Sequence, residues 1–366
     1  MKRCSVLAPA AAAAAVFAAA AMTSAGPSQS THTQLTQSNP ARASDVQPSK
    51  LTRMLMAKDP TSNAARRAQI DDIYNVPLGP SSIRPTRGPS TQPGQVIYGD
   101  DDRVDVYAEP DPVLRELADS TAVVVSASSL TDNGNGTYSL AASPWTSQGG
   151  TLCPDEPFRG QLEAGFCSSF LVGSDIIVTA GHCVDNGDIS SGVAFVFGFY
   201  QIDEATNANV TAIPADNVYF GDAIIDQSLG GGLDHSVVRI DREVVGRNPV
   251  PIRRQGVVSL GEPLVVIGNP SGLTTKIAGG AIVRGVQPTF IESNLDTYGG
   301  NSGSAVFNAN TLEVEGILVR GATDFVTVGG CVRSNVLSDH GSENEDVSRL
   351  AAIASFIHAL GMAVSP

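Results

Sequence analysis

The sequence predicts an all-β fold built from a pair of antiparallel β-barrels. Glycine and proline are frequent, with 37 and 22 copies in 366 residues, and aromatic residues make up only 5% of the chain. Such a composition suits many short strands joined by tight turns better than a helical bundle. From about residue 96, short β-branched runs alternate with turn residues and no helix of useful length separates them, which disfavours a parallel sheet built from βαβ units. Roughly ten or more strands at this spacing indicate two barrels.

Each expected strand is a short apolar or β-branched run bounded by turn residues. We expect the first barrel over about residues 115–242 and the second over about residues 250–340. The clearest runs begin at Thr121, Phe170, Ile176, Val193, Ser236, Pro263, Ala281, Ser304 and Val314.

The N-terminal part of the chain differs from the rest. A short basic start is followed by an alanine-rich apolar run and then by Thr23-Ser-Ala25-Gly, which is the pattern of a secretory signal peptide over residues 1–25. Residues 26–95 are rich in Ser, Thr, Gln, Pro and Asn without sustained periodicity, so we expect a flexible pro-segment or leader. The folded domain is then expected over residues 96–366.

One amphipathic helix is expected to close the chain, over about residues 343–361. Ser342-Glu-Asn-Glu345 has the spacing of a capping box, and apolar residues recur at helical spacing after Val347.

Charge and composition exclude several classes of function. The formal net charge of −14 argues against nucleic-acid binding, which needs a basic surface. After the signal peptide no apolar segment is long enough to span a bilayer, so we expect no stable membrane insertion. A zinc site needs three or four ligands at one point, and no such cluster is visible in the sequence. We therefore expect neither a metal nor another cofactor.

Three motifs in the order His, Asp, Ser point to nucleophilic catalysis. They are Thr179-Ala-Gly-His182-Cys183, Leu233-Asp234-His-Ser-Val-Val, and Asp296-Thr-Tyr-Gly-Gly-Asn-Ser302-Gly-Ser. A serine hydroxyl is a poor nucleophile unless an imidazole accepts its proton and a carboxylate orients that imidazole. The chain order excludes the subtilisin and α/β-hydrolase arrangements.

At these motifs the chain resembles the chymotrypsin-like serine peptidases, and among them the bacterial glutamyl endopeptidases. The resemblance extends from about Val96, whose Val-Ile-Tyr-Gly is like the start of the mature glutamyl endopeptidases, to the terminal segment. It implies two six-stranded barrels, and it implies a disulfide between Cys167 and Cys183 around the histidine loop.

The resemblance also implies a role for each residue of the site. Ser302 would attack the peptide carbonyl, His182 would accept and return the proton, and Asp234 would hold the imidazole tautomer. The backbone N–H groups of Gly300 and Ser302 would form the oxyanion hole, where glycine lets the backbone approach the substrate closely.

Two positions depart from the family pattern. Asn301 stands where pancreatic-type enzymes carry the aspartate that pairs with a new N-terminal amine. Leu318 stands where glutamyl endopeptidases are expected to hold the acidic substrate side chain with a histidine.

These departures leave the substrate specificity open. We assign the pocket to Asp296, Thr297, Leu318 and Arg320. Asp296 could receive a basic substrate side chain, Arg320 could receive an acidic one, or the two could pair and cancel. A buried carboxylate gains most from a guanidinium partner, so of these three interpretations we favour a basic substrate side chain at the acyl side of the cut.

By elimination, Cys153 and Cys331 are expected to form a second disulfide. The sequence thus predicts a secreted or periplasmic serine endopeptidase that acts on proteins or peptides as a monomer, and we expect it to be made as a zymogen. The alternatives are a glutamate-specific endopeptidase, a catalytically silent binding module on a protease fold, and a non-peptidase esterase.

Overall fold

The computed structural model describes residues 95–354 apart from residue 231. The expected signal peptide, almost all of the expected leader, and the C-terminal part of the expected helix lie outside these residues.

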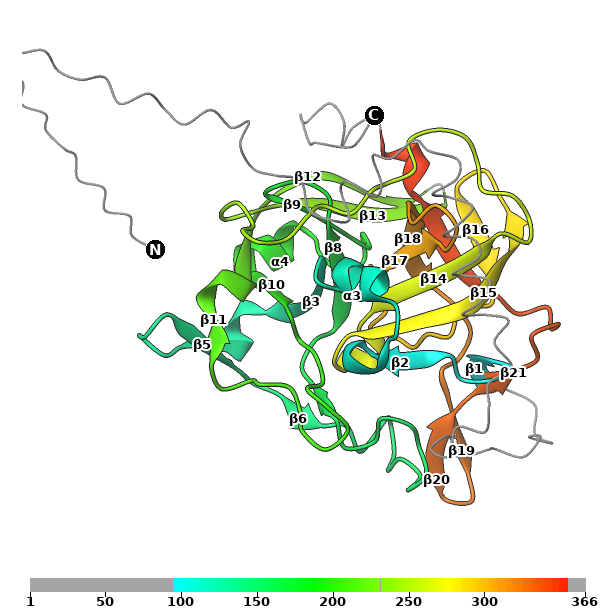
Figure 1. Ribbon diagram of the computed structural model, residues 1–366, viewed down its shortest axis with the longest axis horizontal. Coiled ribbons are helices and arrows are strands. Elements are labelled where there is room, and N and C mark those ends of the chain that lie inside the picture. The colour runs from blue at the N-terminus through cyan, green and yellow to red at the C-terminus, as the bar shows by residue number, and fades with distance from the viewer. Residues whose placement is uncertain (1–94, 231, 355–366) are drawn as a thin grey trace, which may run out of the picture. The chain divides into compact units, whose positions relative to one another are not determined.

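The first barrel is closed, and each of its strands pairs antiparallel with its two neighbours (Figure 1). Alternate side chains of a strand point to opposite faces. Val124 and Phe195 therefore pack inside the barrel, while Val123 and Ala194 pack outside it against a small sheet. In barrel order the strands are β10 (Val193–Phe197), β12 (Val218–Gly230), β13 (Leu233–Ile240), β9 (Ile176–Thr179), β8 (Cys167–Leu171) and β3 (Thr121–Ser126).

The second barrel also has six antiparallel strands, and pairing of its first and last strands closes it. A short strand, β2 (Arg103–Asp105), joins its edge by pairing with β15. In barrel order the strands are β14 (Pro263–Gly268), β17 (Ala305–Asn308), β18 (Val314–Arg320), β22 (Glu345–Arg349), β16 (Phe290–Ser293) and β15 (Lys276–Val286). The prediction of two six-stranded antiparallel barrels is confirmed.

The prediction of a helix beginning near residue 343 is wrong. Residues Glu345–Arg349 form β22, followed by the 3-10 turn η5 (Leu350–Ala352). The second barrel therefore extends past residue 340 and takes its sixth strand from this segment. β22 pairs with both β16 and β18, and burial of Val347 in the barrel core accompanies this pairing. Tertiary pairing thus overrides the local helical pattern, since strand-or-helix preference in short segments is weak.

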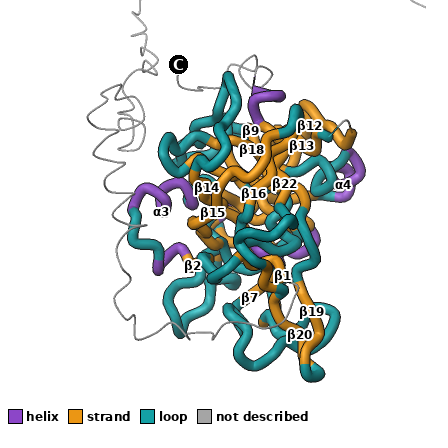
Figure 2. Tube along the Cα trace, turned by 90° about the vertical axis from the view of Figure 1, so that its right-hand side faces the viewer, coloured by secondary structure: helices purple, strands orange, loops and turns teal. Residues whose placement is uncertain are grey.

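The remaining elements connect and cover the two barrels. Strand β1 pairs in parallel with β21 and lies beside β19 and β20 (Figure 2). The helices are α3 (Pro112–Ala118), α4 (Asn186–Ser191), and the 3-10 turns η1 (Val106–Ala108), η2 (Ala127–Ser129), η3 (Ala215–Asn217) and η4 (Pro270–Gly272). The short strands are β1 (Gln95–Tyr98), β4 (Leu130–Asp132), β5 (Thr137–Leu140), β6 (Ser143–Pro144), β7 (Leu162–Glu163), β11 (Ile213–Pro214), β19 (Phe325–Val328), β20 (Cys331–Ser334) and β21 (Val336–Leu337).

The four cysteines of the described residues form the two expected pairs. Cys167 bonds to Cys183 with a Cα–Cα distance of 6.1 Å. Cys153 bonds to Cys331 with a Cα–Cα distance of 5.0 Å, which ties the loop after β6 to β20. No helix among the described residues is long and apolar enough to cross a membrane.

Candidate active site

His182 and Asp234 meet because β9 and β13 pair antiparallel, with Thr179 opposite Ser236. His182 follows the end of β9 by three residues, and Asp234 lies near the start of β13. His182 Nδ1 lies 2.8 Å from Asp234 Oδ2, and the backbone N–H of His182 donates to Asp234 Oδ1 at 3.1 Å. The imidazole side chain is 41% exposed and the carboxylate 15% exposed.

The environment of Asp234 keeps this carboxylate ionised. Burial alone would raise its pKa, but hydrogen bonds from the side chain and backbone of His182 and from the backbone of Gly181 outweigh burial, and the pKa is lowered. An ionised carboxylate only accepts hydrogen bonds, so Nδ1 of His182 carries the proton. Nε2 is then left with a lone pair that can accept a proton.

Ser302 is the second residue of the second of two successive type II turns, 298–301 and 301–304. The N–H of Asn301 donates to the carbonyl of Tyr298 at 2.9 Å, and the N–H of Ser304 donates to the carbonyl of Asn301 at 2.8 Å. Gly300 has a φ of 95° and Gly303 a φ of 91°, and each is the third residue of its turn. A type II turn needs a positive φ at this position only, which glycine adopts without a steric penalty.

The carbonyl groups of Gly299, Gly300 and Ser302 each accept a hydrogen bond from another segment of the chain. The carbonyl of Gly299 accepts from the N–H of Ser271 at 2.6 Å, and that of Ser302 accepts from the N–H of Ser168 at 2.8 Å. The hydroxyl of Ser168 donates to the carbonyl of Gly300 at 2.8 Å. In a trans peptide the C=O and N–H point in opposite directions, so the N–H of Gly300 points away from Ser271.

The N–H groups of Gly300 and Ser302 donate no hydrogen bond within the described part of the chain. Two such neighbouring donors, fixed in direction by the turns, are what an oxyanion requires.

The backbone of Ser302 lies against the residue that follows His182. Its carbonyl oxygen is 3.6 Å from Cys183 Sγ, in the disulfide that joins the histidine loop to β8. Among the described residues, no hydrogen bond joins the hydroxyl of Ser302 to the imidazole of His182. The structure thus pairs the histidine with the aspartate and places the serine loop beside them, without a direct bond between hydroxyl and imidazole.

The sulfur atoms of Cys167 and Cys183 and a ring nitrogen of His182 lie within 4.8 Å of one another, but the sulfurs are bonded to each other and are not thiolate ligands.

The expected pocket residues have other partners. Asp296, which is 3% exposed, accepts the backbone N–H of Tyr98 and that of Asp102, both at 2.8 Å. Arg320 is at the surface and pairs with Asp346 at 2.8 Å rather than with Asp296. Leu318 packs in the core of the second barrel.

Glu345 is a residue of the site that the sequence analysis missed, because it was interpreted as part of a helix cap. Its side chain is buried, and Thr297 Oγ1 donates to its Oε2 at 2.8 Å. The N–H of Ala322 approaches its Oε1 at 3.4 Å. Burial raises the pKa of Glu345 to about 8. Gly321 leaves room for this carboxyl, because a Cβ there would clash with both carboxylate oxygens.

A second acid lies close to Glu345. Asp324 Oδ2 accepts the N–H of Gly299 at 2.7 Å, and burial raises the pKa of Asp324. Within the described residues neither Glu345 nor Asp324 forms an ion pair. The loop that leads to Ser302 is therefore flanked by two carboxyl groups that form no ion pair among the described residues, although the more distant Arg103 guanidinium acts to lower the pKa of Asp324.

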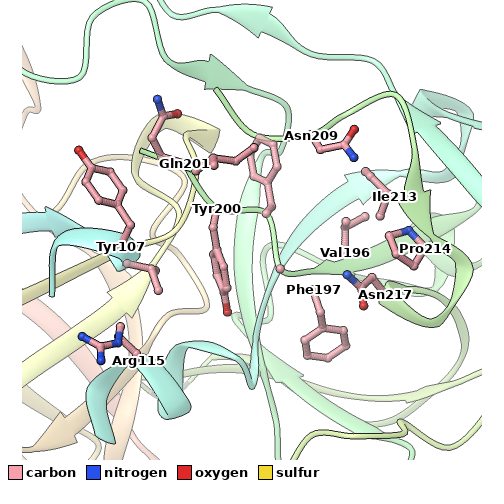
Figure 3. Close-up of a pocket in the computed structure, with 14 residues that line it drawn as sticks. Tyr107, Arg115, Val196, Phe197, Tyr200, Gln201, Asn209, Ile213, Pro214 and Asn217 are labelled. Atoms are coloured by element: carbon pink, nitrogen blue, oxygen red, sulfur yellow. The ribbon is translucent and has the colours of Figure 1, made fainter. Parts of the chain in front are cut away.

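A cavity of about 400 Å³ lies elsewhere, beside the first barrel (Figure 3). Residues of η1, α3 and β10 line it, together with the segment after β10, including Tyr107, Arg115 and Tyr200. Since it contains none of His182, Asp234 or Ser302, we do not assign it to the candidate active site.

Part of the chain is similar to known proteins. Residues 167–317 match the family described as the trypsin-like peptidase domain. One similar solved structure is a Glu endopeptidase in complex with MPD, with 18% identity and a TM-score of 0.41, covering 72% of this chain and 98% of that chain. Another is the inactive form of the Rv3671c protease, from M. tuberculosis H37Rv, with 14% identity and a TM-score of 0.39, covering 69% of this chain and 98% of that chain. No curated protein matches the chain.

Proposed function

We propose that the protein is a serine endopeptidase, because residues 167–317 match the trypsin-like peptidase domain family. The observation that carries the proposal is the His182–Asp234 pair, in which an ionised carboxylate holds Nδ1 at 2.8 Å and leaves Nε2 to act as a base. A side-chain pair of this kind is what activates a serine nucleophile in acyl transfer.

The reaction proceeds in two acyl-transfer steps. Ser302 Oγ attacks the substrate carbonyl while His182 Nε2 accepts the hydroxyl proton, and the imidazolium then gives this proton to the leaving amine. The acyl-enzyme is hydrolysed by water with His182 as base in the same way. During each step the N–H groups of Gly300 and Ser302 stabilise the developing oxyanion, because their directions are fixed before the substrate arrives.

Labelling with a fluorophosphonate probe tests this proposal. The full chain is expected to react covalently at Ser302, and a Ser302→Ala variant is expected not to react, because the probe requires an activated serine hydroxyl. A folded chain that fails to react would instead support the catalytically silent binding module. Hydrolysis of simple acyl esters without hydrolysis of casein would favour the esterase.

We further propose that the enzyme cleaves after basic residues and that Glu345 selects them. Near Ser302, β18 is joined to the serine loop by bonds from Gly303 N–H to the Leu318 carbonyl and from Leu318 N–H to the Ser304 carbonyl. The segments 297–300 and 319–322 both lead away from this junction, and the carboxyl of Glu345 contacts both. A substrate side chain between these segments therefore meets a carboxyl that forms no ion pair within residues 95–354. We do not assign this purpose to Asp296, because it is buried and each of its oxygens already accepts a backbone N–H group.

A Glu345→Gln variant tests this assignment of specificity. The ratio of kcat/KM for a peptide with arginine at the acyl side of the cut to that for the same peptide with glutamine is expected to fall about 10- to 100-fold, the worth of a charge-assisted hydrogen bond. Because burial raises the pKa of Glu345 to about 8, and a cation favours the ionised form, the wild-type ratio is expected to rise with pH toward this value. Any effect of pH that is common to both substrates cancels in the ratio.

The matched control is Glu292→Gln, on the neighbouring strand β16, which is expected to leave the ratio unchanged. A ratio that is independent of pH and unchanged in the Glu345 variant would refute the assignment. A preference for glutamate at the acyl side would support the glutamate-specific alternative.

We also propose that the protein acts outside the cytoplasm, as a secreted or periplasmic enzyme made as a zymogen. The two disulfides support this location, since such bonds persist in oxidising compartments. Its partners would be protein or peptide substrates, and we expect a monomer.

A further inference from the structure

The segment from Tyr98 to Asp105 contacts the loop that leads to Ser302. The backbone N–H groups of Tyr98 and Asp102 donate to the two carboxylate oxygens of Asp296, each at 2.8 Å. Asp296 stands two residues before Tyr298, the first residue of the type II turn that orients the Gly300 N–H. The segment thus holds the start of the turn through both oxygens of one buried carboxyl.

Arg103 holds the same turn through a side chain. Its Nη2 donates to the hydroxyl of Tyr298 at 2.6 Å, and its guanidinium lies 3.9 Å from the centre of the Tyr298 ring. The guanidinium is oriented by Asp101, to which Nε and Nη2 each donate at 2.8 Å. A bidentate pair fixes the plane of an arginine, and the plane here stacks on the residue whose carbonyl closes the turn. The same Tyr298 hydroxyl is also hydrogen-bonded to the hydroxyl of Ser334.

The segment itself is anchored to the second barrel. β2 pairs with β15, with Val104 opposite Ile277. Lys276 Nζ forms a buried ion pair with Asp105 Oδ1 at 2.7 Å, and it donates to Gln161 Oε1 at 2.8 Å. Breaking a buried pair leaves an uncompensated charge and costs several kcal/mol, so the segment is held at its far end as well.

Asn301 does not offer a seat for a chain-terminal amine. Its Oδ1 accepts from the hydroxyl of Ser304 at 3.2 Å, inside the second turn, and the side chain carries no charge. The groups that support the turn on this side are all internal to the chain: the carboxyl of Asp296, the guanidinium of Arg103 and backbone N–H groups.

We infer that residues 98–103 form an internal brace that holds the oxyanion turn, with Arg103 and Asp296 as its positioning residues. The inference rests on the proposed function, because the turn matters for turnover only if Gly300 donates to an oxyanion. The brace supports the turn without a free amine, so formation of the oxyanion hole does not depend on a cut before Val96.

An Arg103→Met variant of the full chain tests the brace. The substitution keeps an apolar side chain next to Tyr298 and removes the planar cation. We expect kcat to fall about 10- to 100-fold with KM changed less than about threefold, because a displaced donor weakens transition-state binding and not ground-state binding. The inhibition constant of a peptide aldehyde, which forms a tetrahedral adduct, should rise by the same factor as kcat falls. Arg103→Lys, which keeps the charge but not the bidentate geometry, should recover part of the loss.

Arg247→Met is the matched control, because Arg247 also stacks on an aromatic ring, Phe197, and donates to a side chain, that of Asn217, but does so in the first barrel. It is expected to leave kcat and the aldehyde affinity unchanged.

Misfolding is separated from mispositioning by expressing kcat per site labelled by the fluorophosphonate probe, and by a second variant. Asp296→Asn has the same shape but directs an amide NH2 at one of the two backbone N–H groups, so it should lower kcat in the same way. The brace is overturned if both variants keep kcat per labelled site and aldehyde affinity within twofold of the wild type. In that case the wild type is still labelled and the proposed function stands, whereas an unlabelled wild type would overturn both.

Discussion

An Asp234→Asn variant is expected to lose about 10,000-fold in kcat while it remains folded. The reason lies in the two oxygens of this carboxylate. Oδ1 accepts the backbone N–H of His182 at 3.1 Å, so the amide oxygen of an asparagine would keep that place and its NH2 would face Nδ1 of His182. Nδ1 would then have to accept, the proton would move to Nε2, and the imidazole could no longer take a proton from Ser302.

A second His–Asp pair in the same barrel provides the control for this variant. His235 Nε2 lies 3.0 Å from Asp226 Oδ2, between β13 and β12, so Asp226→Asn makes the same chemical change away from Ser302. Steady-state kinetics and thermal unfolding of both variants test whether the loss of kcat is specific to Asp234, since Asp226→Asn is the control variant. If kcat of Asp234→Asn fell by less than tenfold, Asp234 would not set the tautomer and the proposed role of His182 would be wrong.

A Gly300→Ala variant is expected to lower kcat by about 100- to 1,000-fold, the loss that follows removal of one oxyanion donor. Gly300 has a φ of 95°, and a Cβ there would lie 2.8 Å from the carbonyl oxygen of Asn269 and from the N–H nitrogen of Gly272. Rotation of the Gly299–Gly300 peptide would relieve both the unfavourable positive φ and the two close contacts of the Cβ. That rotation breaks the bond from Ser271 N–H and turns the Gly300 N–H out of the site.

The control for the glycine variant separates backbone strain from the loss of the donor. Gly261 also has a positive φ, 79°, but nothing lies within 4 Å of the place of its Cβ. Gly261→Ala should therefore cost about 1–2 kcal/mol of stability and leave kcat unchanged. An equal fall of kcat in both variants would show that strain alone explains the effect, and that Gly300 donates to no oxyanion.

The two barrels could be predicted from the sequence because their strands show a recognisable local pattern of residues. The runs at Thr121, Ile176 and Val193 combine β-branched residues with turn residues at both ends, and each lies in a strand of the first barrel. The motifs around His182 and Asp234 also sit where the register of β9 and β13 brings them together. Their catalytic roles, like that of Ser302, stay predictions until the chemistry is measured.

The parts that could not be predicted depend on partners far away in the chain. Glu345 has the spacing of a helix cap, and only its neighbours on β16 and β18 make its segment a strand. Asp296 has the position of a specificity carboxylate, but its oxygens are taken by backbone N–H groups almost 200 residues earlier, at Tyr98. Local sequence patterns carry no information about such contacts. The sequence could therefore suggest that a specificity pocket exists, but not which carboxyl group of the protein lies in it.

Ser168 gives the two barrels a common fixed point. It belongs to β8 of the first barrel, yet its hydroxyl and N–H hold the carbonyls of Gly300 and Ser302, and its hydroxyl oxygen also accepts from the N–H of Asn269 after β14. His182 and Asp234 belong to the first barrel, and Ser302 belongs to the second. Under the proposed mechanism, sliding of one barrel on the other by about an ångström would move Ser302 away from His182 and strain the turns that orient the N–H groups of Gly300 and Ser302. Turnover would then fall before either barrel unfolded.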